Sequence, residues 1–135
     1  MLINRPISRL IRFTAALSLA VPILIHSASA AEGWFTQAQA ARGHQFFNNQ
    51  CAQCHRPDLT GAAGPALIGP DFLKKWNQVS DLYTFEHEKM PATNPGSVPP
   101  DQLWAITAYI LQKNGFAAGQ SDLGDAASSR ALTPH

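Results

Sequence analysis

Two scarcities narrow the classes of protein to which this chain can belong: it has few charged residues and almost no cysteine. Asp, Glu, Lys and Arg make up 14% of the 135 residues, and the formal net charge is +1. No long run of one sign occurs, which argues against a nucleic-acid-binding surface, because neutralising phosphates takes clustered Lys and Arg. Two cysteines exclude a scaffold of several disulfides and a zinc site of four thiolates. With 45% hydrophobic residues, we expect one folded domain with a modest core.

One long apolar run occurs in the chain, and it lies within the first thirty residues. Three arginines and no acid precede the apolar stretch 13–25, and Ala28-Ser29-Ala30 follows it. This is the three-part layout of a secretory signal peptide, so we expect residues 1–30 to be cleaved after Ala30. A membrane anchor is the alternative, but crossing a bilayer takes about 20 apolar residues. We therefore predict export to the periplasm, with no membrane span in the mature protein.

Strand patterns are missing as well, because no stretch alternates between apolar and polar residues for long enough. Helical spacing instead predicts an all-α domain with four helical segments: Thr36–Asn49, Asp71–Asn77, Ser80–His87 and Pro100–Asn114. Thr36 and Ser80 are suited to cap the first and third segments, and Gly115 is suited to stop the last.

Between these segments the chain is rich in residues that interrupt helices. Residues 57–70 and 90–100 contain most of its prolines and several of its glycines. Loops this long in a small domain usually surround something. Residues 117–135 are rich in Ala, Gly, Ser and Asp, and we expect them to form a weakly ordered C-terminal tail. The folded domain is therefore expected to span residues 31–116.

The most specific motif is Cys51-Ala52-Gln53-Cys54-His55, which has the spacing that attaches a c-type haem. Each thiol adds to one of two neighbouring vinyl groups, and two cysteines three positions apart reach both vinyls from one turn of chain. The next residue is then held under the iron, so His55 can supply the proximal imidazole ligand. We therefore predict one covalently attached haem c, with Cys51 and Cys54 as its thioether anchors.

Three other uses of the same five residues are weaker. A zinc knuckle needs further Cys or His at ligand spacing, and His44, His87 and His135 form no paired motif. A thioredoxin-like redox site follows a strand, whereas this motif follows an Ala-rich helical segment. A structural disulfide across a two-residue loop contributes little stability.

The second axial ligand is less clearly marked, because a lone methionine is often a core gap-filler. Met90 stands 35 residues after His55, in a Pro-rich loop. A thioether is a soft ligand for haem iron, and His/Met ligation raises the reduction potential. The alternatives are His87 and, less favourably, His44. An open site, as in a peroxidase or gas sensor, is a further alternative, although no distal acid–base pair for peroxide chemistry is identified.

Taken in order, the motifs over nearly all of residues 36–116 resemble the class I cytochromes c. This resemblance implies that His55 and Met90 are the axial ligands and that the carbonyl of Pro65 orients His55. It also implies a cytochrome c fold, with three to five helices and long loops around one haem, in which Gly43 lets the first helix cross the last one closely. The motifs that carry it are Gly43 with Phe47, Gly64-Pro65-Ala66-Leu67, Met90-Pro91, and Ile106 with Tyr109.

A closer resemblance concerns the partners and is to small bacterial cytochromes c that accompany quinoprotein (PQQ-type) dehydrogenases. It implies an electron carrier rather than an enzyme, which takes electrons from a dehydrogenase and passes them toward a terminal oxidase by transient docking. We expect a monomer, with Trp76 or Tyr83 donating a hydrogen bond to a haem propionate. The resemblance is carried by Gly64-Pro65-Ala66-Leu67, Asp71-Phe72-Leu73 with Trp76, Ala108-Tyr109-Ile110-Leu111 and Asn114-Gly115-Phe116.

Overall fold

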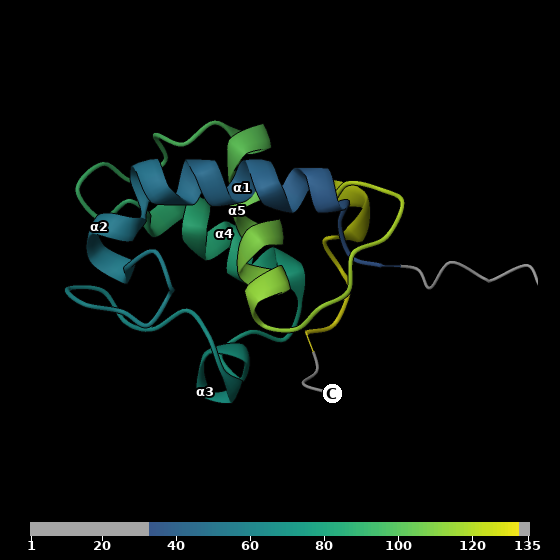
Figure 1. Ribbon diagram of the computed structural model, residues 1–135, viewed down its shortest axis with the longest axis horizontal. Coiled ribbons are helices and arrows are strands. Elements are labelled where there is room, and N and C mark those ends of the chain that lie inside the picture. The colour runs from purple at the N-terminus through teal and green to yellow at the C-terminus, as the bar shows by residue number, and fades with distance from the viewer. Residues whose placement is uncertain (1–32, 133–135) are drawn as a thin grey trace, which may run out of the picture.

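Helices and the loops between them make up the computed structural model, which describes residues 33–132 (Figure 1). In chain order they are α1 (Gln37–Gln50), α2 (Ala52–His55), α3 (Pro70–Leu73), α4 (Val79–Lys89), α5 (Pro100–Lys113) and the short 3-10 helix η1 (Asp125–Ala127). Apart from two isolated β-bridges, these residues form no strand, which confirms the predicted all-α fold. Among residues 33–132, no helix is both long and apolar enough to cross a membrane. The predicted signal peptide, residues 1–30, lies outside the described residues.

The helices α1 and α5 cross in close contact at the centre of the domain (Figure 1). A Cβ atom at Gly43 would lie 1.8 Å from the carbonyl oxygen of Ala105, so only glycine permits this approach. One turn further along each helix, Phe47 and Tyr109 are buried with their ring centroids 5.5 Å apart. All of α5 from Leu103 to Leu111 is buried, which makes this helix the core of the fold. The crossing at Gly43 therefore has the form that the resemblance to the class I cytochromes c implied.

The helix boundaries follow local hydrogen bonds as well as apolar spacing. Thr36 caps α1 as predicted, since its side chain accepts a hydrogen bond from the N–H of Gln39 at 3.0 Å. Gly115 follows the end of α5 with a φ of 89°, a conformation that favours glycine. The predicted cap at Ser80 is wrong, because Gln78 and Asp81 form a capping box that starts α4 at Val79.

The helix α3 is shorter than predicted and ends at Leu73 rather than at Asn77. Beyond it, the N–H of Lys75 donates to Phe72 at 3.2 Å and that of Trp76 donates to Leu73 at 3.1 Å, the tighter pattern of a 3-10 turn. This turn places Trp76 beside Phe72 and Phe85, with ring centroids 6.0 and 5.3 Å apart. The apolar spacing that predicted a helix thus reflects an aromatic cluster.

The C-terminal segment packs against the domain, which differs from the weakly ordered tail that its composition predicted. Leu123 and Leu132 are 3% and 2% exposed and belong to the hydrophobic core. Arg130 lies 3.9 Å from the ring centroid of Trp34 and donates to the carbonyl of Gly33 at 2.9 Å. Two buried leucines and one cation–π contact offset the flexible residues between them. The folded unit therefore reaches Leu132, beyond the expected boundary at residue 116.

Candidate functional site

A largely apolar cavity of about 540 Å³ lies beside α2, α4 and α5. It brings together six of the seven residues predicted for the site: Cys51, Cys54, His55, Pro65, Trp76 and Met90. Most of the other lining residues are apolar and include Phe47, Leu67, Phe72, Leu82, Phe85, Val98, Leu103, Ile106 and Ile110. Cofactor sites typically have volumes of about 300–1,000 Å³, so the cavity is large enough for a cofactor.

A single helical turn at the end of α1 presents the two thiols and the imidazole. Cys51 ends α1, where its N–H donates to the carbonyl of Phe47 at 2.8 Å, and it also precedes α2. The N–H of His55 donates to the carbonyl of Cys51 at 3.0 Å, so His55 follows one turn later. Both cysteines are free thiols that line the same cavity. The motif thus places two thiols and one imidazole at the same cavity, and the two thiols form no disulfide.

The imidazole of His55 is held in a fixed orientation by the loop that follows it. His55 is 7% exposed, and its Nδ1 lies 2.8 Å from the carbonyl oxygen of Pro65. Because a carbonyl only accepts, Nδ1 donates and Nε2 keeps its lone pair. A Cβ atom at Gly64 would lie 2.5 Å from Cε1 of His55, so this position has no room for a side chain. The loop therefore prepares Nε2 as a ligand.

Met90 is the one of the three proposed distal ligands that lines the cavity. It follows the last residue of α4, and its N–H donates to the carbonyl of Glu86 at 3.0 Å. His87 is exposed and stacks parallel to Tyr83, with ring centroids 6.2 Å apart. His44 is exposed on α1 and stacks on Tyr109 at 4.7 Å. The geometry thus favours the thioether over either imidazole.

A buried carboxyl group that the sequence analysis did not identify also lines the cavity. Glu86 is 7% exposed, and the Thr107 hydroxyl donates to its Oε2 at 2.6 Å. Burial raises the pKa of Glu86 to about 8, because the charged form is desolvated and this single hydrogen bond compensates only in part. Its other oxygen, Oε1, has no hydrogen-bond partner among residues 33–132. In the sequence, Glu86 stands among exposed polar residues of α4, and no pattern marks it as buried.

The thiol of Cys51 strongly resists deprotonation to the thiolate. Burial raises its pKa to about 12, and the carboxyl of Glu86 and the neighbouring Cys54 add to this effect. Metal ligation and thiol–disulfide exchange both use the thiolate. In addition, residues 33–132 contain no group of three or more His, Cys, Asp or Glu side chains placed to hold a metal ion. The raised pKa disfavours the thioredoxin-like alternative, and the described residues offer no ligand cluster for the zinc alternative.

The two aromatic residues predicted near a propionate have different surroundings. Trp76 lines the cavity, and its buried Nε1 has no hydrogen-bond partner within the described part of the chain. Tyr83 is not among the lining residues, and its ring stacks on that of Trp104 with centroids 3.8 Å apart. Burial raises the pKa of Tyr83, with smaller contributions from Asp125 and Glu86. The cavity therefore includes one of these two donors.

These residues fit a covalently attached haem. Two thiols lie within one helical turn, an imidazole offers a free Nε2, and a thioether reaches the same apolar space. The buried indole N–H of Trp76, which has no partner among residues 33–132, is also available for an acidic group of a ligand. An imidazole and a thioether are ligands that haem iron accepts.

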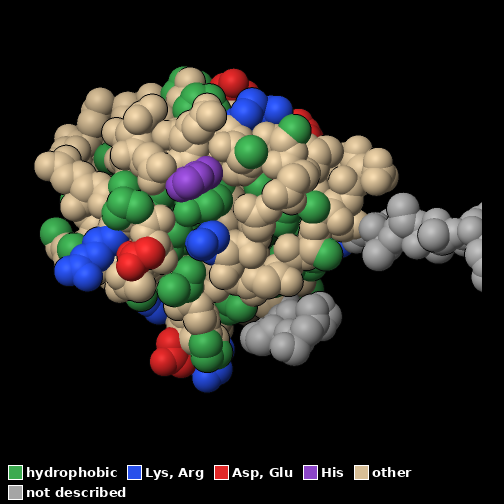
Figure 2. All heavy atoms as spheres, viewed as in Figure 1, with side chains coloured by type: hydrophobic (Ala, Val, Ile, Leu, Met, Phe, Trp, Pro, Cys, Tyr) green, Lys and Arg blue, Asp and Glu red, His purple; other side chains and the backbone are tan. Residues whose placement is uncertain are grey.

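Charge around the cavity is sparse. Of the described residues that line it, Lys75 and the buried Glu86 are the ones with charged side chains. Lys74 pairs with Asp71 at 3.4 Å, and Lys89 with Glu88 at 3.9 Å. On the face shown in Figure 2, acidic and basic side chains are interspersed, with no broad patch of one sign.

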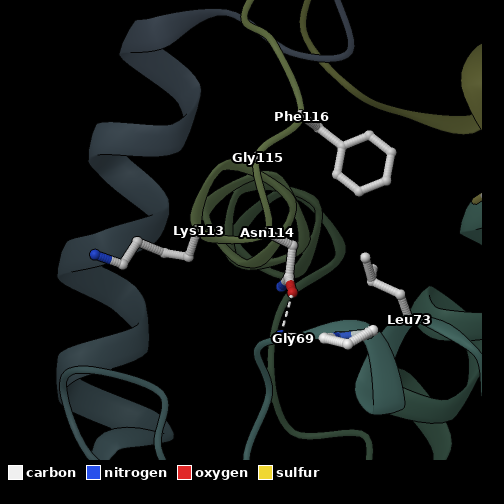
Figure 3. Close-up of a pocket in the computed structure, with 7 residues that line it drawn as sticks. Gly69, Leu73, Lys113, Asn114, Gly115 and Phe116 are labelled. Carbon is white, nitrogen blue, oxygen red and sulfur yellow. Dashed lines mark hydrogen bonds between the residues drawn. The ribbon is translucent and has the colours of Figure 1, made fainter. Parts of the chain in front are cut away.

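A second cavity, of about 500 Å³, lies at the end of α5 and contains none of the predicted site residues. The side chain of Asn114 points toward Gly69 and accepts its N–H at 2.9 Å, as the dashed line in Figure 3 shows. Asn114 also donates to the carbonyls of Leu67 and Ile110 at 2.9 and 2.8 Å. The polar atoms of Asn114 are thus occupied in joining α5 to the loop before α3, which is a structural role.

Comparisons with known proteins agree with this geometry. Residues 38–110 match the family described as "Cytochrome C oxidase, cbb3-type, subunit III". A segment of 77 residues is 39% identical to photosystem II extrinsic protein V of Synechococcus sp. (strain JA-3-3Ab) and covers 56% of this chain but only 32%, about a third, of that relative. The fold is similar to a chain in the crystal structure of the sulfane dehydrogenase SoxCD from Paracoccus pantotrophus. That match has a TM-score of 0.53 and 25% identity, and it covers 78% of this chain and 61% of the other.

Proposed function

Since the chain belongs to the family of cytochrome C oxidase, cbb3-type, subunit III, whose domains are class I c-type cytochromes, we propose that it carries single electrons on one haem attached through Cys51 and Cys54. Cytochromes c are generally electron carriers. The observation that carries the proposal is the convergence of two thiols, one imidazole and one thioether on a single apolar cavity.

His55 and Met90 are the proposed axial ligands. His55 contributes Nε2, because its Nδ1 donates to the carbonyl of Pro65. Met90 contributes its sulfur from the end of α4. When bound, the haem supplies an iron that gains or loses one electron. Two protein ligands leave no position for a substrate, which favours a carrier over a peroxidase or a gas sensor.

The lining of the cavity favours a high reduction potential. Apolar side chains such as Leu82, Leu103 and Ile106 keep water away from the cofactor. A dry surrounding of this kind disfavours the additional positive charge of the oxidised state. The buried indole N–H of Trp76 donates to a haem propionate in this proposal, a role for which Tyr83 is less suitable because it does not line the cavity.

The proposed carrier is a periplasmic monomer that docks transiently with its redox partners. The signal-peptide pattern of residues 1–30 supports export. The likeness to a chain of a sulfane dehydrogenase supports a dehydrogenase as the electron donor, and a terminal oxidase is the proposed acceptor. The resemblance to cytochromes that accompany quinoprotein dehydrogenases favours a PQQ-type enzyme as that donor. Phe85, which is 42% exposed, lies at the cavity and offers an apolar contact for a weak redox encounter.

The decisive experiment is to express the full chain together with a haem-attachment system and to analyse the exported product. Mass spectrometry should give one haem per chain, and the haem should stay attached on a denaturing gel. The double variant Cys51→Ala, Cys54→Ala should lose covalent haem completely. Haem that stays attached to this variant would contradict the proposed attachment.

The distal ligand is tested on the same protein. Met90→Ala should abolish the sulfur-to-iron charge-transfer band of the ferric form and lower the reduction potential, because a soft thioether is removed. His87→Ala is the matched control and should leave the band unchanged. A band that survives Met90→Ala would assign the iron to another ligand. Substantial peroxidase turnover by a five-coordinate wild-type protein would replace the carrier with an enzyme.

A further inference from the structure

Residues 119–132, which we call the strap, lie outside the region that matches the family, residues 38–110. Figure 1 shows this yellow segment passing the start of α1. Asp122 accepts from the hydroxyl of Thr36 and pairs with Arg42 at 3.2 Å. Gln39 donates to the carbonyl of Leu123 at 2.8 Å and accepts the N–H of Leu123 at 2.6 Å. The first half of the strap is therefore fixed to α1.

The second half of the strap is fixed to the start of α4. The N–H of Val79 donates to the carbonyl of Arg130 at 3.0 Å, and the N–H of Ser80 donates to that of Ser128 at 2.8 Å. In return, the N–H of Leu132 donates to the carbonyl of Asn77 at 2.9 Å. The first N–H groups of a helix have no partner within the helix. Here the strap supplies partners for two of them, so the first turn of α4 is hydrogen-bonded to the strap.

The other end of α4 has a separate point of attachment. The side chain of Glu86 accepts from Thr107 of α5 at 2.6 Å, and both residues are buried. One turn later, the N–H of Met90 donates to the carbonyl of Glu86. At a rise of about 1.5 Å per residue, Met90 lies about 6 Å beyond Glu86 along the helix axis, and Val79 lies about 10 Å before it.

We propose that the strap positions the Met90 sulfur, with α4 acting as a lever whose fixed point is the contact between Glu86 and Thr107. Without the strap, α4 is held by its contacts with α5, at Glu86 with Thr107 and at Tyr83 with Trp104, and its first turn loses the two hydrogen bonds that fix the direction of the helix. Releasing the strap at Val79 therefore displaces Met90 at the opposite end. This inference rests on the proposed function, because it takes Met90 as the axial ligand.

The test uses the full-length haem-loaded protein and the substitution Val79→Pro. Proline suits the first position of a helix, and the extended backbone of Gln78 suits a residue before proline, so the helix itself is preserved. The substitution removes the N–H that donates to Arg130, and it replaces the buried side chain of Val79 with a ring of similar size. Val79→Ala is the matched control, because it keeps this N–H and removes more of the side chain. A stop after Leu123 is the second variant, since it keeps the attachment to α1 and removes the attachment to α4.

The readout is the dissociation constant of imidazole for the ferric iron, together with the sulfur-to-iron band. Imidazole must displace Met90, so a tenfold larger fraction of displaced Met90 tightens its apparent binding about tenfold. We expect this gain in Val79→Pro and a larger one after the stop at Leu123, with little change in Val79→Ala. Equal imidazole binding in wild type and Val79→Pro would overturn the proposal, even if the truncated chain failed to fold.

Failure of the proposed function gives a different result. If the wild-type protein lacks the sulfur-to-iron band, then Met90 is not the ligand, and amide hydrogen exchange tests the strap directly. The N–H of Met90 should exchange faster in Val79→Pro than in Val79→Ala if α4 acts as a lever. Equal exchange in these two variants would contradict the mechanical coupling itself.

Discussion

The two halves of the cavity are built in different ways. The half that holds His55 comes from one short stretch, residues 51–67, and most of the hydrogen bonds that close it lie within the stretch. Gly64 donates to Cys54 at 3.0 Å and Leu67 donates to Leu59 at 2.9 Å, while Asn114 at the end of α5 adds a bond to Leu67 at 2.9 Å. The half that holds Met90 depends on distant contacts, from Thr107 on α5 and from the strap. Local contacts are formed at low entropic cost, whereas distant ones depend on the whole fold. We therefore expect the Met90 half to loosen first under stress.

The largest expected effect comes from breaking the His55 half. In Gly64→Ala, the new methyl group would lie 2.5 Å from the imidazole of His55, and the surrounding loop is tied to Cys54. We expect a loss of about 3 kcal/mol in the free energy of unfolding, measured by denaturant titration, because a buried overlap forces the backbone to shift.

Gly124→Ala is the control for this substitution. A Cβ atom at Gly124 meets nothing within 4 Å, and its extended backbone accepts any residue. Its free energy of unfolding should stay within about 0.5 kcal/mol of wild type. Similar losses in both variants would mean that the loop around His55 is as adaptable as the surface, and the contrast between the two halves would fail.

Per pH unit, an intermediate effect is expected from the carboxyl that supports the Met90 half. Burial raises the pKa of Glu86 from 4.5 to about 8, so the folded state holds this proton more tightly than the unfolded state does. Between these two pH values the folded state binds more protons, and the free energy of unfolding falls as pH rises, by up to about 1.4 kcal/mol per pH unit. Above the higher pKa this contribution levels off.

Glu86→Gln should flatten that decline, because the amide keeps the shape and has no charge to desolvate. Glu88→Gln is the matched control, since Glu88 is exposed on the same helix. Denaturant titrations from pH 5 to pH 9 would measure both slopes. A decline that is equally steep in wild type and Glu86→Gln would show that another group causes it.

The smallest effect is expected at Trp76, which sharpens the comparison because it lies between the two halves in sequence. Trp76→Phe keeps an aromatic ring beside Phe72 and removes the buried N–H. We expect a change of about 1 kcal/mol or less in stability and a measurable shift in reduction potential, since one hydrogen bond to a propionate is lost. Trp34→Phe is the control, because Trp34 contacts Arg130 of the strap and does not line the cavity, and it should leave the reduction potential unchanged. Equal potentials in all three proteins would remove Trp76 from the proposed site.

Prediction from the sequence succeeded where short spacing determines structure. The motif at Cys51 predicted a turn that brings Cys54 and His55 together, because that turn depends on residues only a few positions apart. The close crossing at Gly43 was implied by the resemblance to the class I cytochromes c, since its partner Ala105 lies on a distant helix. Prediction was less successful for the tail, where Leu123 and Leu132 are buried by contacts with α1 and α4. It also missed Glu86, since the burial of an acid depends on Thr107, which lies 21 positions away. Tertiary packing determines whether such residues are buried, and the local composition of the sequence does not predict it.

The contact at Gly43 has a consequence for engineering. Because α1 meets the backbone of Ala105 with no side chain between them, this joint cannot be adjusted by exchanging one residue for a larger or smaller one. Cys51 stands at the end of α1, so the position of its thiol depends on the crossing of α1 and α5. A transplant of the cysteine motif into another scaffold must therefore bring α1 and α5 together as one piece.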